Sequence, residues 1–337
     1  MSGAAGSGQG EQHGAARAGR KPAWLKRAAP APRQYRATGA LLDELDLHTV
    51  CDEARCPNKG ECFSAGTASF LILGDACTRA CRFCSVTHAA PQAAGGGAAG
   101  SEAPTLAQSA LDRDEPGRVA AAAERLGLRH VVITSVTRDD LADGGAGHFA
   151  AAVAAVRERL PGATVEVLIP DLGGDEAALR AVLAARPDVL GHNLETVPRL
   201  YTEVRPQAGY GRSLDLLRRA AGWARAAVCG ADGAAPSPVR LLVKTGLMAG
   251  LGESAAEVGA VLADCAAVGV DLVTIGQYLQ PRRDCLPVRR FVTPAEFAAW
   301  ERRGEELGLR VTAAPFVRSS YRAGEALHGA RPDGAST

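Results

Sequence analysis

Residues 69–84 read SFLILGDACTRACRFC: a short apolar run, a glycine, and three cysteines with the spacing C-x3-C-x2-C. The length and composition of SFLIL are typical of a short buried strand. A tight loop with three cysteines can hold three corners of a [4Fe-4S] cube and leave one iron without a protein ligand. A structural zinc ion that takes its fourth ligand from elsewhere in the chain is the alternative. The stretch therefore predicts a strand that is followed directly by a metal-binding loop.

The remainder of the chain alternates predicted helices with predicted strands. Further apolar runs lie at 130–135, 164–170, 188–195, 239–246 and 271–279. Helical patterns lie at about 117–127, 147–160, 175–185, 213–228, 254–268 and 295–307. Short apolar strands that are separated by such helices predict a parallel α/β sheet with right-handed crossovers.

Six strands fit two architectures. They are too few for a closed eight-stranded barrel, so an open doubly wound sheet and a partial (β/α)6 barrel remain. No G-x-G-x-x-G follows the first strand, which disfavours a dinucleotide-binding fold. In either architecture the chemistry collects at the carboxyl ends of the strands. The cysteine loop lies at this edge, and its position favours an iron–sulfur cluster over zinc.

The 337-residue chain has 38 Lys and Arg against 37 Asp and Glu, and 4% of its residues are aromatic. This balance gives no support to a nucleic-acid binder that relies on bulk charge or on base stacking. No apolar run approaches the length of a membrane span, and the N-terminus does not resemble a secretory signal. We therefore expect an intracellular protein whose clustered cysteines bind metal. The predicted compartment is the cytoplasm, with a mitochondrial or plastid matrix as the alternative, since residues 1–20 make a poor transit peptide.

A second cysteine group has the spacing C-x4-C-x5-C; its members are Cys51, Cys56 and Cys62. This is not the spacing of a zinc finger, and His88 is the nearest candidate for a fourth ligand. Three other cysteines belong to neither group. Cys265 lies on the apolar stripe of the helix at 254–268, Cys229 lies in a Gly/Ala-rich loop, and Cys285 lies among arginines. We expect Cys265 to be a core residue.

Seven motifs follow one another along the chain: CDEARCPNKGECF, GDACTRACRFCSV, VVITSVTRDDLADGGAGHFA, HNLETVPRLY, GLMAGLGE, GQYLQP and RSSYRAGE. Their order resembles that of the lipoyl synthase family in the radical S-adenosylmethionine superfamily, from about Lys21 to Glu325. The resemblance implies an α/β fold, a partial (β/α)6 TIM-type barrel with a cysteine-rich N-terminal extension and a C-terminal extension. The implied segments are a disordered leader (1–20), an extension with auxiliary cluster ligands (21–68), the barrel (69–290), and a C-terminal helix with the RSSY motif (291–337).

The same resemblance implies two [4Fe-4S] clusters. One would be held by Cys77, Cys81 and Cys84, with S-adenosylmethionine chelating its open iron. The auxiliary cluster would be held by Cys51, Cys56, Cys62 and, from the RSSY motif, Ser320. Arg318 would position or shield that serine, so that Ser320 and Arg318 are the candidate catalytic residues. The implied contacts with S-adenosylmethionine are Thr134, Ser135, Asn193, Glu195, Lys244, Gly250 and Glu253.

As in that family, the substrate would be an octanoyl chain linked to a lysine of a lipoyl carrier domain. Such domains would belong to the acyltransferase (E2) subunits of 2-oxoacid dehydrogenases and to the glycine cleavage H protein. A 5′-deoxyadenosyl radical would abstract hydrogen from C6 and then from C8, and the auxiliary cluster would donate both sulfur atoms. An external electron donor and an iron–sulfur carrier that rebuilds the cluster are further implied partners. Neither nucleic acid nor a membrane is expected as a partner.

Rival interpretations share part of this pattern. Biotin synthase has the C-x3-C-x2-C loop but lacks the C-x4-C-x5-C group. Methylthiotransferases space their first cysteines more widely and add a basic RNA-binding domain. A non-enzymatic electron carrier or a zinc-stabilised scaffold is the alternative from another class. About eight irons and eight sulfides per chain would indicate two cubanes, whereas zinc alone would exclude the enzyme.

Overall fold

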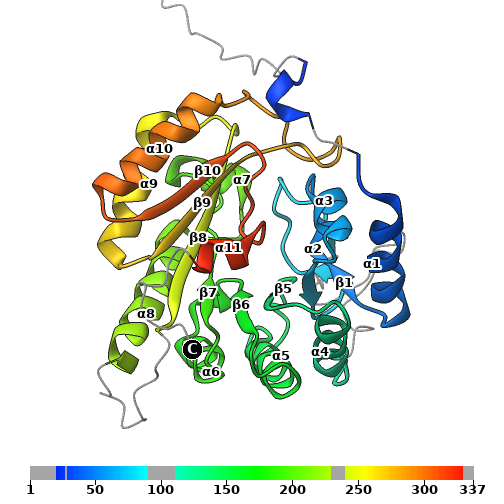
Figure 1. The fold of residues 1–337 in the computed structure, drawn as a ribbon. Coiled ribbons are helices and arrows are strands. Elements are labelled where there is room, and N and C mark those ends of the chain that lie inside the picture. Colours follow the sequence, from blue (N-terminus) through cyan, green and yellow to red (C-terminus); the bar gives the residue numbers. More distant parts are fainter. Residues whose placement is uncertain (1–19, 27–28, 90–110, 229–239, 329–337) are drawn as a thin grey trace, which may run out of the picture.

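The computed structural model describes residues 20–26, 29–89, 111–228 and 240–328, so the predicted leader and the loops at 91–104 and 229–238 lie almost wholly outside it. One eight-stranded sheet has the order β1-β2-β5-β6-β7-β8-β9-β10 (Figure 1). All neighbouring strands are parallel except β1 and β2. The strands are β1 (His48–Thr49), β2 (Ser69–Ile72), β5 (His130–Ser135), β6 (Thr164–Leu168), β7 (Val189–Gly191), β8 (Leu242–Ala249), β9 (Leu272–Gln277) and β10 (Arg310–Ala314). A two-stranded sheet joins β3 (Ala76–Cys77) to β4 (Thr87–His88).

The strand order decides between the two predicted architectures. Strands β2 and β5 to β9 are the six that the sequence predicts, and they neighbour one another in chain order. A doubly wound sheet reverses its order at a switch point, and this sheet does not. Right-handed crossovers without a reversal place the connecting helices on one face. The predicted partial barrel is therefore confirmed, and β1 and β10 extend it by one strand at each edge.

The predicted helices are confirmed to within a few residues. Sequence signals explain where two of them begin: Ser254 with Glu257, and Thr293 with Glu296, form capping boxes before α9 and α10. None of the helices in the described ranges is long and apolar enough to cross a membrane. In chain order the helices are η1 (Ala23–Leu25), α1 (Pro32–Glu44), α2 (Val50–Glu53), α3 (Lys59–Ser64), α4 (Glu115–Arg125), α5 (Ala146–Arg159), η3 (Leu172–Gly174), α6 (Glu176–Ala184), η4 (Pro198–Leu200), α7 (Tyr201–Val204), α8 (Tyr210–Val228), α9 (Ala255–Val268), α10 (Pro294–Glu306) and α11 (Ala323–His328).

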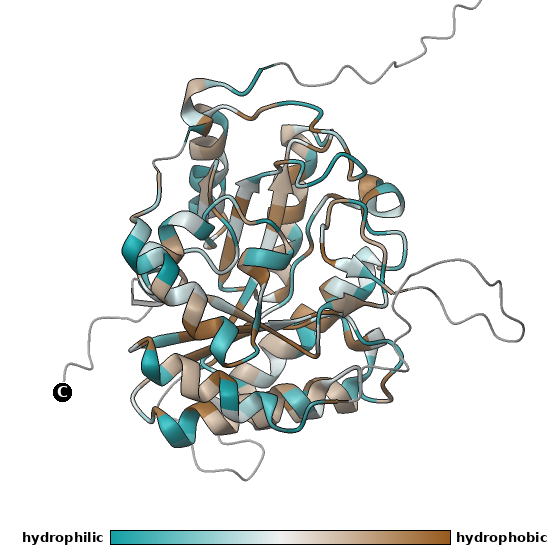
Figure 2. Cartoon of the chain, turned by 90° about the vertical axis from the view of Figure 1, so that its right-hand side faces the viewer, coloured by the Kyte–Doolittle hydropathy of each residue, from teal (hydrophilic) through white to brown (hydrophobic). Residues whose placement is uncertain are grey.

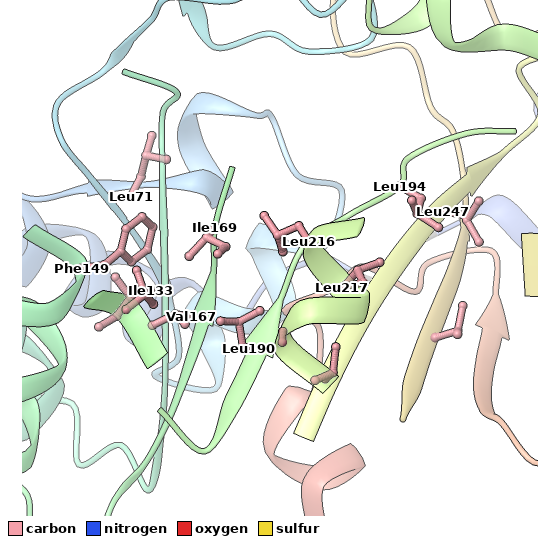
Figure 3. Close-up of a cluster of buried hydrophobic side chains, with 14 of the residues drawn as sticks. Leu71, Ile133, Phe149, Val167, Ile169, Leu190, Leu194, Leu216, Leu217 and Leu247 are labelled. Carbon is pink, nitrogen blue, oxygen red and sulfur yellow. The ribbon is translucent and has the colours of Figure 1, made fainter. Parts of the chain in front are cut away.

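The core lies between the sheet and its outer helices. Figure 3 shows Phe149 of α5 against Leu71 and Ile133, with Val167 and Leu190 on the next strands. Figure 2 shows the same separation: hydrophobic residues gather on the strands and on the helix faces turned toward them. Cys265 is fully buried in this core, as predicted. The outer helices therefore fix the sheet and leave its inner face for other segments.

The C-terminal segment returns to the inner face. After β10 the chain turns back, and α11 contacts β5. In Figure 1 this segment, drawn in red, lies between the N-terminal helices and strands β8 and β9. The two extensions of the barrel therefore meet over the inner face of the sheet.

Candidate active site

A cavity of about 1010 Å³ opens over the inner face of the sheet. Its walls come from the first cysteine group, from strands β5, β6, β8 and β9, from the residues after β7, and from the C-terminal motif. Among its lining residues are Cys51, Cys56, Cys62, Cys84, Asn193, Glu195, Arg318, Ser319, Ser320 and Tyr321. The structure thus brings the first cysteine group and the RSSY motif, which are separated by most of the chain, to one cavity.

Two short helices hold the first cysteine group. Cys51 lies in α2 and Cys62 in α3. Cys56 lies in the turn between them, where its backbone N–H donates to Cys51 O at 3.0 Å. Thr49 caps α2 by accepting a hydrogen bond from the backbone N–H of Asp52. All three cysteines line the cavity from this one scaffold.

Hydrogen bonds tie the C-terminal motif to the first cysteine group. Asn58 Nδ2 donates to Phe316 O at 2.7 Å, and Tyr321 Oη donates to Glu61 Oε1 at 2.6 Å. Arg322 forms an ion pair with the same carboxylate at 3.1 Å. Asn58 and Glu61 belong to the segment that carries the cysteines. The thiols and the motif are therefore positioned by the same contacts.

The two serines of the motif differ in their surroundings. Ser319 Oγ donates to Asn193 Oδ1 at 2.7 Å, and Ser319 O accepts from Lys244 Nζ at 2.6 Å. The Ser320 side chain has no hydrogen-bond partner among the described residues, although Ser320 lines the cavity. Arg318 lines the cavity next to it. A hydroxyl without a protein partner is available to an external group, which supports Ser320 rather than Ser319 as the predicted ligand.

A buried ion-pair network anchors the second cysteine group, Cys77–Cys84. The backbone N–H groups of Arg79 and Thr137 point at Cys77 Sγ, at 3.5 and 3.3 Å. Arg79 makes two hydrogen bonds of 2.7 Å to Asp139 and one of 2.6 Å to Asp171, and only 4% of it is exposed. Because both carboxylates follow strands of the sheet, the loop is fixed to the carboxyl edge.

The thiols of both groups fit a cationic partner. They are all free, and burial raises the pKa of Cys51 and of Cys84 to about 12. Thiols of this kind stay protonated at neutral pH unless a metal offsets the cost of a buried thiolate. In the described ranges, no three His, Cys, Asp or Glu side chains gather as a single metal ion requires. Three free thiols in each group match three corners of a [4Fe-4S] cube.

Four of the predicted S-adenosylmethionine contacts lie in β5 (Thr134 and Ser135) or just after β7 (Asn193 and Glu195). Thr134 Oγ1 donates to the backbone of β6 at 2.8 Å. Ser135 Oγ is buried and has no hydrogen-bond partner in the part of the chain that the structure describes. Asn193 and Glu195 line the cavity, and burial raises the pKa of the Glu195 carboxyl although Arg205 opposes the shift. Thr134 and Ser135 do not line the cavity, and the contact of these four residues with S-adenosylmethionine stays a prediction.

The other three predicted contacts lie in or after β8 and bind groups of the protein. Lys244 is buried against Glu166 and the C-terminal motif. Gly250 has φ of 106°, and a Cβ there would lie 2.2 Å from a side-chain nitrogen of β9. Glu253 accepts hydrogen bonds from two backbone N–H groups of this turn, at 2.5 and 2.9 Å. None of these residues lines the cavity, and their contact with S-adenosylmethionine stays a prediction.

The sequence gives no signal for two residues beside the second cysteine group. Arg205 is 8% exposed, donates to Asn193 O at 2.8 Å, and interacts with Cys81. Cys285 Sγ donates to Cys84 O at 3.4 Å. Each comes from a segment far along the chain, so only the folded structure brings it to the cysteine loop.

Comparison with known proteins gives the family that the motifs resemble. Residues 71–230 match the radical SAM superfamily, and residues 8–56 match the N-terminal domain of lipoyl synthase of the radical SAM family. The chain is 50% identical to the lipoyl synthase of Nitratidesulfovibrio vulgaris (strain Hildenborough) over 312 residues, which cover 92% of this chain and 93% of that one. Identity to the lipoyl synthase of Oleidesulfovibrio alaskensis is 51% (90% and 94% covered), and to that of Rubrobacter xylanophilus 48% (92% and 88% covered). With such identity over nearly the whole of each chain, and with both cysteine groups in place, the chain belongs to the lipoyl synthase family of radical S-adenosylmethionine enzymes.

Proposed function

We propose that this chain inserts two sulfur atoms, at C6 and C8, into an octanoyl group that is linked to a lysine of a lipoyl carrier domain. Lipoyl synthases use S-adenosylmethionine and two [4Fe-4S] clusters. The observation that carries the proposal is the shared cavity, which is lined by the first cysteine group, by Cys84 of the second group, and by Ser320. A substrate in this cavity would lie next to cysteines of both groups.

The walls of the cavity suit an acyl chain. Apolar side chains contribute much of the lining, among them Phe83, Leu128, Val132, Leu168, Leu247 and Met248. Each methylene that moves from water to such surroundings gains about 0.8 kcal/mol. Charged and polar residues also line the cavity, among them Arg55, Glu61, Arg129, His130 and Glu195. The apolar side chains support a substrate with a hydrocarbon chain.

When bound, S-adenosylmethionine and the clusters supply the radical and the sulfur, which no side chain can provide. Cys77, Cys81 and Cys84 would hold one cluster, and the first cysteine group with Ser320 would hold the other. Oxygen is a harder and poorer ligand for cluster iron than thiolate, so Ser320 makes one corner easier to open. Ser135, Asn193 and Glu195 would orient the cofactor, and the buried walls would exclude water and stray hydrogen donors.

The stoichiometry requires partners. Two C–H bonds are replaced by two C–S bonds, and each replacement uses one S-adenosylmethionine, one electron and one sulfide sulfur. An external electron donor and an iron–sulfur carrier are therefore part of the proposal, as are carrier domains of the E2 subunits and the glycine cleavage H protein. The bacterial origin of the compared relatives supports a cytoplasmic location. We also propose the segments 21–68, 69–290 and 291–337 as the functional divisions of the chain.

Anaerobic turnover tests the function. The full chain, reconstituted with iron and sulfide, is mixed with an octanoylated carrier domain, S-adenosylmethionine and dithionite, and the carrier is weighed by mass spectrometry. We expect a mass gain of two sulfur atoms. No gain, in protein that holds about eight irons per chain, would refute the assignment.

Two matched cysteine variants separate the roles of the groups. Cys81→Ala should abolish cleavage of S-adenosylmethionine together with sulfur insertion. Cys56→Ala should keep the cleavage and lose the insertion. If both variants lost cleavage equally, the division of labour between the groups would be wrong.

A further inference from the structure

We propose that Lys244, held by Glu166, is a positioning residue that fixes the C-terminal motif inside the barrel and so sets the place of Ser320. The role of Ser320 as a ligand rests on the proposed function, whereas the fixing of the segment does not. It is a different role from the cofactor contact that the sequence predicts for Lys244.

The ammonium of Lys244 has three protons and three acceptors. Lys244 Nζ lies 2.8 and 3.1 Å from the two carboxylate oxygens of Glu166, and 2.6 Å from Ser319 O. Both charged residues are buried, with exposures of 2% for Lys244 and 1% for Glu166. Because an ammonium donates at most three hydrogen bonds, these contacts occupy its donors. The carboxylate holds the ammonium in place, and the ammonium holds the backbone of the motif.

A second hydrogen bond fixes the same serine from another strand. Ser319 Oγ donates to Asn193 Oδ1, just after β7, at 2.7 Å. Ser319 is therefore bound at its carbonyl by Lys244 of β8 and at its hydroxyl by Asn193, which follows β7. Ser319 also lines the cavity, but its hydroxyl cannot donate to another group there without breaking its hydrogen bond to Asn193. The next residue, Ser320, keeps its hydroxyl for another partner.

Strands β8 and β9 carry glycines at the places where the C-terminal motif lies against them. Side chains two residues apart share a face of a strand, so Gly246 follows Lys244 on the inner side of β8. A Cβ on Gly246 would lie 2.6 Å from Ser319 Oγ, and one on Gly276 of β9 would lie 2.0 Å from Val317 O. Real Cβ atoms do not approach this closely. The motif can lie this close to the two strands only because both positions are glycine, and Lys244 binds it at that place.

Fixing the C-terminal motif has a chemical use, because the motif carries the predicted cluster ligand Ser320. A buried ion pair contributes little to stability compared with apolar residues of similar volume, and specifying one conformation is its better attested use. Here the pair lies across β6 and β8 and ends on the residue before Ser320. Figure 1 shows the C-terminal segment beside these strands. The arrangement accounts for two charges in the interior of a barrel.

Hydrogen exchange on the metal-free full chain tests the positioning. The double variant Lys244→Met with Glu166→Gln removes both charges and leaves no orphan carboxylate. We expect the backbone amides of residues 317–322 to exchange at least about tenfold faster, while those of β5 and β6 stay within about twofold of the wild-type rate. Arg157→Met is the control, because it also removes the cation from a pair with a buried carboxylate, Asp188, at 3.1 Å. It should leave the exchange of 317–322 unchanged, and Lys244→Arg should restore slow exchange.

A second readout concerns the auxiliary cluster. In a background with Cys77, Cys81 and Cys84 replaced by alanine, only the first group can hold a cluster, and about four irons per chain are expected. The double variant should lose this iron several times faster to a chelator. Should it fail to fold, Lys244→Gln, which cannot span Glu166 and Ser319 together, is measured by the same criteria.

The results separate the two proposals. Unchanged exchange at 317–322, or acceleration spread equally over all strands, would overturn the positioning role. Selective exchange at 317–322 in the double variant, together with a wild-type chain that fails to convert the octanoylated carrier, would support the positioning role and refute the function. Selective exchange without faster iron loss would refute the link to Ser320.

Discussion

Ser319 and Ser320 show how much one position matters in this site. Ser319 is engaged by Asn193 and Lys244, whereas the Ser320 hydroxyl has no partner among the described residues. Ser320→Ala should reduce sulfur insertion roughly 100-fold or more, because even replacing a residue that only hydrogen-bonds to a metal ligand reduces activity by up to about 100-fold. Ser319→Ala removes one neutral hydrogen bond of about 1 kcal/mol and should reduce insertion by less than about tenfold. Carrier turnover by mass spectrometry measures both variants. A larger loss for Ser319→Ala than for Ser320→Ala would make Ser319 the ligand.

His192 gives the chain a defined response to pH. It is buried, Nδ1 faces Ile169 O at 2.9 Å, and Nε2 faces Ser213 Oγ at 2.9 Å. Burial, with the positive charge of Arg205, lowers the pKa of His192 to about 4. The unfolded chain therefore binds a proton that the folded chain refuses between pH 6.5 and 4, and stability falls as the pH drops through that window.

The expected loss from this residue is about 2 kcal/mol between pH 7.5 and pH 5. Urea unfolding of the metal-free chain at the two pH values measures it. His192→Gln should remove this part of the pH dependence. His48→Gln, at a histidine with 39% of its side chain exposed, should retain it. Equal pH dependence in wild type and His192→Gln would contradict the assignment.

Single residues also mark the limit of reasoning from the sequence. Cysteine spacing alone identifies both groups, because ligands of a compact site lie close together in the chain. Ser320 follows only from the resemblance, since nothing local distinguishes it from Ser319. The sequence could not predict the roles of Asn58, Arg79 and Arg205. Their partners, Phe316, Asp171 and Cys81 respectively, are distant in sequence.

At the scale of elements, apolar runs predict the six inner strands and helical periodicity predicts the covering helices. The two edge strands escape this reasoning for a physical reason. β1 has two residues, and β10 buries only Ala313, so neither forms an apolar run. The end of β8 also shifts, because the sequence predicts a strand that ends at residue 246, whereas the structure continues it to Ala249.

Glycines on the strands and helices carry opposite expectations. Gly276→Ala in β9 places a methyl group 2.0 Å from Val317 O and should destabilise the chain by about 1–3 kcal/mol through overpacking. Gly259→Ala in α9 meets nothing within 4 Å and should stabilise it by up to about 1 kcal/mol through helix propensity. Thermal unfolding compares the two. A neutral Gly276→Ala would mean that the C-terminal segment does not rest on β9.

At the scale of the whole molecule, the site exists only when both ends of the chain meet. The cysteines of the first group lie before the barrel and the motif lies after it. Tyr321 Oη to Glu61 Oε1, at 2.6 Å, is one of the bonds that joins them. Tyr210 Oη to Asp264 Oδ2 is a bond of the same chemistry and the same 2.6 Å length. It joins the neighbouring helices α8 and α9 and leaves the two ends untouched, so it offers a matched control.

Double-mutant cycles on the two pairs separate stability from closure of the site. Tyr321→Phe with Glu61→Gln, and Tyr210→Phe with Asp264→Asn, should each give a coupling energy of about 1 kcal/mol in urea unfolding. Only replacement of Tyr321 and Glu61 should speed the loss of iron from the auxiliary cluster, because of the two pairs only this one holds the motif against the first cysteine group. The measurement is chelator-driven iron release from chains whose second group is replaced by alanine. Equal release rates for the two pairs would mean that the barrel alone fixes the motif, through Lys244 and Asn193, and that the joined ends serve stability only.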